Sequence, residues 1–365
     1  MPANKPAVGI MALYLSRKRL EERAYFAKLV RAAERMGMQA FVFTPEDVRG
    51  NQILAHLYNT KDRSWSRKLV PFPDVIYDRC RYQPNERFRK LQQFRKQYPH
   101  LLYMNRPLAN KWVIYQLLSK NRSLKPHLPE TVMLNSTNTA MSLLSRYHRI
   151  YTKPINGTGG RGILCIERLG AGRFRVRGRD LRRRILKPRI CTAKELKSIL
   201  LKQVARKNCI AQQGIDIRLP NGRVHDFRVL IQKNGSGKWQ FTGGAARVGA
   251  RGSITSNLHG GGKAVAMDKL LEKRFSSSSK ARDLQKQVEE LSFQVVRELE
   301  QKFHDLCEIA LDLAIDHQGR IWMLELNPKP SREVFARIGK SSTYQTAIMR
   351  PLEYARWLYQ QRVSK

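Results

Sequence analysis

The sequence has few acidic residues. Among its 365 residues, 29 are Asp or Glu and 69 are Lys or Arg, so the formal net charge at pH 7 is +40. A positively charged surface attracts nucleic acids, anionic lipids and acidic polymers without specificity. No helix-turn-helix, zinc-finger or RNA-recognition pattern accompanies the charge. We therefore expect no specific nucleic-acid partner, and the basic surface suits an enzyme at least as well.

Cysteines are also few, and their spacing excludes two classes of protein. They are isolated, odd in number and form no CxxC pair, which argues against a disulfide framework and a metal cluster. No apolar run approaches the roughly 18 residues of a transmembrane helix. The apolar run at 6–15 precedes basic residues and lacks an A-x-A cleavage signal, which favours a buried strand. We expect a cytoplasmic protein whose five cysteines are reduced thiols: Cys80, Cys165, Cys191, Cys209 and Cys307.

The first hundred residues alternate strand and helix signals. AVGIMALYL at 7–15 is typical of a buried strand, and 21–37 repeats apolar positions at helical spacing up to Gly37. Two further strands are expected at 38–44 and 73–80. Strand, helix and strand in this order predict a small parallel α/β sheet.

The rest of the chain also alternates the two signals. Asn110 is expected to cap a helix running to about Lys120, and the serine run at 276–279 is expected to be a mobile loop. The other expected helices are 139–147, 192–207, 281–304 and a last one from about Thr343. The expected strands are 128–134, 149–155, 163–169, 225–232, 238–248, 308–316 and 320–327.

A glycine-rich loop follows one of these strands, in YTKPINGTGGRGI at 151–163. Glycine is costly to order, and its usual purpose in such a loop is to let backbone N–H groups approach a phosphate. GTGGRG is neither a Walker loop nor a Rossmann fingerprint. Lys153 directly precedes the loop and can meet a phosphate as a point charge. The glycines are Gly157, Gly159, Gly160 and Gly162.

The stretch DLAIDHQGRIWMLELN predicts a hairpin that carries two carboxylates on one face. With its turn at 317–318, Asp312 pairs with Met323 and is the diagonal neighbour of Glu325. Asn327 keeps the same parity, so all three oxygen-bearing side chains point the same way. A three-residue turn would break this alignment.

The opposite face of this hairpin is expected to be buried, because leucines occupy its positions. Two carboxylates and an amide oxygen are hard ligands that suit Mg²⁺, which completes its octahedron with waters and nucleotide phosphates. The leucines are Leu311, Leu313, Leu324 and Leu326. Further cations that could meet phosphates are Lys111, Arg161, Arg228 and Arg247.

The segment 172–189 holds nine basic residues and one acid. On a strand, Arg173, Arg175 and Arg177 would share one face. Two interpretations stay open, a solvated face of an ordinary hairpin and a face that binds an acidic substrate or polymer. The second interpretation predicts that changing the three arginines to Gln weakens polyanion binding.

The order of these motifs resembles the ATP-grasp superfamily over roughly 105–339. The likeness is to the glutathione synthetase type and, more narrowly, to the endospore coat-associated (YheC/YheD-like) ATP-grasp proteins. The narrower resemblance is carried by GIM near the start, YTKPINGTGGRGI, DFRVLIQ, GGAARVG and LELNPKP.

The resemblance implies an α/β (α+β) fold in three parts. Residues 1–104 would form the small parallel α/β domain that precedes the ATP-grasp fold. Residues 105–208 would form the small ATP-grasp subdomain with its glycine-rich flap. Residues 209–365 would form the large subdomain, with the metal site and a C-terminal helix.

The resemblance also implies a nucleotide site. Lys111 and Lys153 would hold phosphates, under a flap formed by the four glycines of the loop. The hinge AQQGI would meet adenine through Gln212, and Asp226 would lie near the ribose. This chain has Gln212 and Gln213 where many relatives place an acid in the hinge.

A metal and reaction centre follows from the same resemblance. Arg228 and Arg247 would face phosphates or an acyl-phosphate, and Asn257 with the glycines at 260–262 would line the reacting centre. One or two Mg²⁺ ions are implied, and Mn²⁺ would suit the same ligands. These ligands would be Asp312, Glu325 and Asn327.

The implied activity is that of an ATP-dependent, ADP-forming carboxylate–amine or carboxylate–thiol ligase that acts through an acyl-phosphate. The implied partners are a nucleotide and a carboxylate and amine pair, with an anionic polymer or a spore coat layer as a further partner. The alternative is a non-catalytic, strongly basic spore-coat protein that binds polyanions on an ATP-grasp scaffold.

Overall fold

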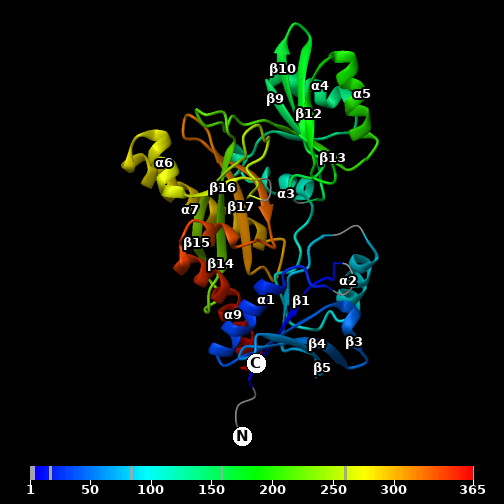
Figure 1. Cartoon of the computed structure of the whole chain (residues 1–365), viewed down its shortest axis with the longest axis vertical. Coiled ribbons are helices and arrows are strands. Elements are labelled where there is room, and N and C mark those ends of the chain that lie inside the picture. The colour runs from blue at the N-terminus through cyan, green and yellow to red at the C-terminus, as the bar shows by residue number, and fades with distance from the viewer. Residues whose placement is uncertain (1–4, 16–18, 83–84, 158, 259–260, 365) are drawn as a thin grey trace.

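The computed structural model describes residues 5–15, 19–82, 85–157, 159–258 and 261–364. Its strands form three sheets that follow one another along the long axis of the molecule (Figure 1). Gly260, one of the glycines predicted to line the reacting centre, lies outside the described residues. No helix in the described ranges, the 23-residue α7 and α9 included, is long and apolar enough to cross a membrane.

The N-terminal sheet has the predicted parallel centre and an antiparallel extension that the sequence analysis missed. Strands β1, β2, β6 and β7 run parallel, with α1 between β1 and β2. Strands β3, β4 and β5 add antiparallel partners beyond β2, so the sheet is mixed. The elements are β1 Ala7–Met11, α1 Arg23–Arg35, β2 Gln39–Phe43, the 3₁₀ turn Pro45–Asp47, β3 Val48–Arg49, β4 Gln52–Asn59, β5 Ser64–Pro71, β6 Val75–Asp78, α2 Glu86–Gln97 and β7 Tyr103–Met104.

The middle stretch of the chain forms a six-stranded antiparallel sheet in the order β12-β11-β10-β9-β13-β8. Helices α4 and α5 pack on one of its faces. Thr192 caps α5 in a capping box with Glu195, which explains why the predicted helix begins there. The elements are β8 Thr131–Met133, α4 Thr137–Arg146, β9 Arg149–Pro154, β10 Leu164–Gly170, β11 Arg173–Arg179, β12 Ile185–Thr192, α5 Ala193–Val204 and β13 Cys209–Gln213.

The third sheet, in the order β16-β15-β14-β17-β18, carries the largest core. Helices α3, α6 and α7 cover one face of it, while α9 packs against β14 and against α1 of the N-terminal sheet. All five cysteines are buried free thiols, as predicted. The elements are α3 Lys111–Leu118, the 3₁₀ turn Lys125–His127, β14 His225–Lys233, β15 Trp239–Val248, β16 Lys263–Ala266, α6 Met267–Phe275, α7 Ser278–Glu300, β17 Glu308–Ile315, β18 Ile321–Asn327, α8 Glu333–Arg337 and α9 Ser341–Val363.

The serine run at 276–279 is not the mobile loop that we expected. Ser276 ends α6 in a left-handed conformation, with φ +50°. The side chain of Ser277 accepts the N–H of Lys280 at 3.1 Å and caps α7, which already begins at Ser278. The run is therefore a break between two helices, a place that suits serine because its hydroxyl satisfies a free backbone N–H.

The hairpin of β17 and β18 has a different register from the predicted one. Its turn spans residues 316–320, where the N–H of Asp316 donates to the carbonyl of Arg320 at 3.1 Å. A β-bulge then shifts the pairing, and Asp312 lies directly opposite Glu325 instead of Met323. The bulge restores the shared face that an odd turn would have broken.

The bulge also changes which residues form the buried face of the hairpin, so the prediction for that face is partly wrong. Met323 packs in the core that Leu311 and Leu313 occupy. Leu324, which we expected in that core, instead packs with Trp322 on the side where the carboxylates lie. The buried face is therefore confirmed for two of the four leucines and is partly formed by Leu326, which packs against the same core.

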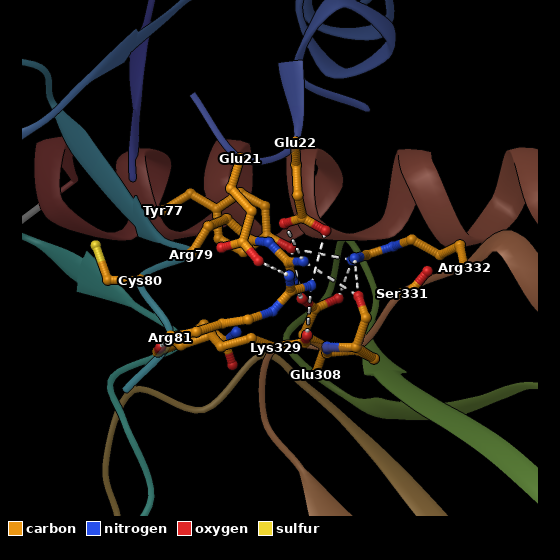
Figure 2. A network of polar contacts seen from close by, with 12 residues as sticks. Glu21, Glu22, Tyr77, Arg79, Cys80, Arg81, Glu308, Lys329, Ser331 and Arg332 are labelled. Carbon is orange, nitrogen blue, oxygen red and sulfur yellow. Dashed lines mark hydrogen bonds and ion pairs between the residues drawn. The ribbon is translucent and has the colours of Figure 1, made fainter. Parts of the chain in front are cut away.

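A buried ion network joins the N-terminal sheet to the end of the third sheet. Glu308, at the start of β17, accepts from Arg79 at 2.7 Å and from Tyr77 at 2.6 Å, and it also binds Arg332. Figure 2 shows how these side chains meet. The side chains of Glu308 and Arg79 are fully buried, so each charge depends on its partners.

We predict that Glu308→Ala lowers the free energy of unfolding by about 3–5 kcal/mol, because among the described residues it leaves Arg332 buried with no carboxylate and Arg79 with Glu22 alone. The measurement is urea denaturation followed by tryptophan fluorescence. Glu86→Ala is the control, since Glu86 is exposed and its one ion pair with a described residue is to Lys90 at 3.3 Å. It should cost no more than about 0.5 kcal/mol. Equal losses in both variants would contradict a structural role for the network.

Candidate functional site

A cavity opens between the sheet of β8–β13 and the sheet of β14–β18. It holds about 1040 Å³ of empty space, with its open mouth included. That is the size of a pocket for a small-molecule ligand or cofactor. Of the predicted site residues that the structure describes, Gly162, Gly261 and Gly262 do not line this cavity. The others do: Lys111, Lys153, Gly157, Gly159, Gly160, Gln212, Asp226, Arg228, Arg247, Asn257, Asp312, Glu325 and Asn327.

The glycine loop forms one wall of the cavity. Gly159 and Gly160 have φ of +70° and +73°, a left-handed conformation that only glycine adopts without strain. A Cβ on Gly160 would lie 3.2 Å from the amide nitrogen of Asn257, so the loop closely approaches the opposite wall. Gly162 lies behind the wall, where a Cβ would come within 3.0 Å of the side chain of Leu181.

Two lysines point into the cavity from different elements. Lys153, at the end of β9, donates to the side-chain oxygen of Gln212 at 2.8 Å. Burial lowers the pKa of the Lys153 ammonium to about 8 against the attraction of Glu325, and the charge of Lys111 adds to the lowering. Lys111, at the start of α3, donates to the carbonyl of Gly157 at 2.6 Å and lies 3.3 Å from Glu325.

A row of charges crosses three adjacent strands on the other side of the cavity. Arg228 on β14 lies opposite Asp312 on β17, which lies opposite Glu325 on β18. Arg228 binds both oxygens of Asp312, one of them at 2.9 Å, and Arg247 reaches the same carboxylate at 3.0 Å. Burial raises the pKa of Asp312, but the two guanidinium groups outweigh it and hold the pKa below its usual value.

Asp226 binds Arg247 rather than facing open space. The two residues are directly paired across β14 and β15, and Arg247 donates to the two oxygens of Asp226 at 2.7 and 2.5 Å. Both residues are buried. In this arrangement Asp226 orients Arg247, and a ribose contact by Asp226 stays a prediction.

The carboxylates can hold a metal ion only together with other ligands. Within the described ranges, no three His, Cys, Asp or Glu side chains gather in a position to bind a metal. Asp312 and Glu325 face each other, and the amide of Asn327 lies 3.3 Å from Asp312. Two carboxylates and an amide fit Mg²⁺, which takes its remaining ligands from water and substrate phosphates.

The sequence analysis missed the apolar part of the cavity. Tyr151 precedes Lys153 by two residues on β9, and this strand spacing could have placed both on one face. The apolar residues from the loop after β13 and from the β15–β16 connection gave no such signal. The missed lining residues are Tyr151, Ile163, Ile215, Ile217, Ile254 and Leu324.

The alternating arginines of β11 do share one face, as predicted. Arg173 and Arg175 are exposed, whereas Arg177 donates to Glu167 at 2.9 Å. Glu167 is 2% exposed and also accepts from Arg149 at 2.8 Å. At the centre of this face a single carboxylate is thus shared by several arginines, and binding of an anion by the three arginines stays a prediction.

The comparisons with known proteins agree with this geometry. Endospore coat-associated protein YheC of Bacillus subtilis (strain 168) is 26% identical over 360 residues, which cover 96% of this chain and 97% of YheC. Protein YheD of the same strain, also endospore coat-associated, is 27% identical over 367 residues, covering 98% of this chain and 80% of YheD.

Solved structures share the fold at low identity. The D-alanine–D-alanine ligase from Coxiella burnetii superposes with a TM-score of 0.55 at 11% identity, covering 99% of this chain and 98% of the ligase. The ATP-grasp ligase PsnB, complexed with a minimal precursor, gives 0.52 at 13% identity and covers 92% and 95%. This is an ATP-grasp fold.

The family model for YheC/D-like ATP-grasp proteins matches residues 100–358, which include every residue that lines the cavity. With this match over most of its length, the chain belongs to the YheC/D-like ATP-grasp family.

Proposed function

We propose that this protein is an ATP- and Mg²⁺-dependent ligase that activates a carboxylate as an acyl-phosphate and releases ADP. An amine or a thiol then attacks the acyl carbon, and inorganic phosphate leaves. The observation that supports this most is the charge arrangement of one cavity. Two facing carboxylates, Asp312 and Glu325, lie among four cations of the same cavity: Lys111, Lys153, Arg228 and Arg247.

The proposed chemistry needs this arrangement because a substrate carboxylate must approach a triphosphate. Lys111 and Lys153 would bind the phosphates from the side of the glycine loop. Arg228 and Arg247 would stabilise negative charge on the group being transferred. Glu325 and Asp312 would hold Mg²⁺, which would neutralise phosphate charge.

No side-chain nucleophile is required in this proposal. The attacking group is the substrate carboxylate, and the leaving group is ADP, whose charge the lysines would balance. Asn257, 3.2 Å from a Cβ position on Gly160, would lie where the loop closes over the reacting atoms. Catalysis would then be positioning and electrostatic stabilisation in a cavity that excludes water.

The proposed link to the endospore coat rests on the two Bacillus subtilis relatives, which are named endospore coat-associated proteins. A non-catalytic coat protein on the same scaffold would be favoured by a broken set of charged site residues. This chain keeps both facing carboxylates and all four cations, which supports an enzyme.

We predict that wild type binds ATP with Mg²⁺ in the micromolar range, and that Lys153→Ala and Glu325→Ala each weaken this binding roughly ten- to a hundredfold, as expected for the loss of a charge-assisted contact. Isothermal titration calorimetry measures the affinities, and circular dichroism checks folding. Lys197→Ala and Glu289→Ala remove matched exposed charges and should change nothing. Full affinity in Glu325→Ala would remove Glu325 from the site.

We also predict that ATP affinity falls as the pH rises above about 8, because the Lys153 ammonium, whose pKa burial lowers to about 8, then loses the proton that attracts a phosphate. The loss should approach tenfold per pH unit. Lys153→Arg keeps its charge across this range and should flatten the profile. An unchanged slope in that variant would assign the titration to another group.

A further inference from the structure

The arginine face of β11 continues past Arg177 into the protein. Arg179, the next residue on that face, is only 5% exposed. Among the described residues, its side chain makes a single hydrogen bond, a long one of 3.4 Å from Nη2 to the hydroxyl of Ser253, and its Nε has no hydrogen-bond partner. No carboxylate among the described residues pairs with it. Ser253 in turn donates to the carbonyl of Thr255, which lines the cavity, at 2.7 Å.

An arginine that is buried without a carboxylate partner destabilises the folded protein. A buried guanidinium without a carboxylate loses its hydration and gains no compensating charge. Other buried arginines of this protein, such as Arg79 and Arg247, have carboxylate partners at 2.5–3.0 Å. The unpaired charge of Arg179 therefore indicates that its partner is an anion from outside the chain.

A second arginine reaches the same place from the β11–β12 turn. The backbone of Arg183 has φ +68°, which is a strained conformation for a residue other than glycine. Asp180 fixes this turn, because its carboxylate accepts the N–H groups of Arg182 and Arg184, both at 2.8 Å. The turn directs Arg183 to the glycine loop, where its Nη2 lies 2.9 Å from a Cβ position on Gly159.

Arg161 of the glycine loop is the third arginine, and it lines the cavity. Burial lowers the pKa of Arg183, and the charges of Arg161 and then Arg179 lower it further, while Glu21 opposes them. Glu21 is bound at 2.8 Å by Arg81, as Figure 2 shows, and it makes no ion pair with Arg183. The three arginines are thus near neighbours that repel one another.

We propose that Arg161, Arg179 and Arg183 form an anion subsite beside the nucleotide cavity, and that it binds a carboxylate side chain of an acidic peptide substrate. The proposal rests on the proposed function, because it names the class of acid that would be joined. It also separates two sets of cations. Lys111, Lys153, Arg228 and Arg247 would serve the phosphates, and the three arginines would serve the substrate.

The surroundings favour a peptide over an inorganic polyanion. Strand β12 is the edge of its sheet, so its outer backbone groups are unpaired within the sheet and could add an extended chain. Exposed apolar side chains lie along this edge between the basic ones. A peptide with both acidic and apolar side chains matches such a surface, whereas polyphosphate has nothing apolar to bury. The exposed apolar residues are Leu181, Ile185, Leu186 and Ile190.

The test uses a fluorescein-labelled oligoglutamate peptide, whose binding to the full chain is followed by fluorescence anisotropy. Arg179→Gln and Arg183→Gln should each weaken this binding roughly tenfold, the effect of losing one hydrogen bond to a charged group. Arg282→Gln is the matched control, since it removes the same charge from an exposed position on α7, outside the β11 face. It should change the affinity by less than about twofold.

Two further readouts separate the subsite from other roles. The melting temperature of Arg179→Gln should equal or exceed that of wild type, because a buried unpaired charge is removed. A lower melting temperature would show a structural role and overturn the proposal for Arg179. ATP affinity, measured by calorimetry, should stay within about twofold in both variants, and an equal loss there would assign the arginines to the nucleotide.

Other outcomes also decide the question. If Arg282→Gln weakens peptide binding as much as the subsite variants, the attraction is general and the subsite is overturned. If polyphosphate shows the same dependence on Arg179 and Arg183 and displaces the peptide, the occupant is polyphosphate and the peptide proposal fails. If wild type binds no ATP but the peptide pattern holds, the proposed ligase function fails and the subsite is supported.

Discussion

The carboxylate of Asp312 is the interaction on which the site depends. It is buried between the guanidinium groups of Arg228 and Arg247 and faces Glu325 across the hairpin. These pairings fix two arginines that would otherwise repel each other in a low-dielectric cavity. Because Asp226 binds Arg247 from the other side, the cations are already oriented before any substrate arrives.

Carboxylates are also shared between several arginines elsewhere in this basic protein. Glu167 serves Arg149, Arg177 and Arg218, and Glu308 serves Arg79 and Arg332. Each of these two buried acids is shared by several cations, and few acids remain for the others. A cation that is buried without an acidic partner destabilises the protein, and selection would remove it unless binding of a ligand offset that loss. This is why we interpret Arg179 differently from its neighbours.

How much of this site the sequence could predict depends on how local each signal is. The glycine loop, Lys153 and the two carboxylates are read from short stretches, and they do meet in one cavity. The register of the hairpin could not be predicted, because neither its turn nor its bulge has a sequence pattern of its own. In the turn, the N–H of Arg320 donates to the Asp316 carboxylate at 3.0 Å, and the bulge compensates for the odd length of the turn.

Features that depend on distant packing were missed for a different reason. Strand β5 is largely exposed, so it lacks the alternation of apolar residues that marks a half-buried strand. Whether an arginine in a basic run is solvated, as Arg173 is, or buried, as Arg179 is, depends on which loop covers it. Composition and spacing are the same for both residues, and only the tertiary structure separates them.

The junction with the N-terminal sheet also bears on the position of the proposed metal ligands. Strand β17 carries Glu308 at its start and Asp312 four residues later, so the buried network anchors the strand that holds the carboxylate. Beyond the end of β18, Lys329 donates to the carbonyl of Asp78 at 2.5 Å and is 7% exposed. Both strands of the carboxylate hairpin are therefore fixed to the N-terminal sheet close to the site. In the proposed site, a carboxylate displaced by about 1 Å would no longer share an ion with its neighbour. The N-terminal sheet would therefore support the proposed catalytic geometry as well as form a separate layer of the fold.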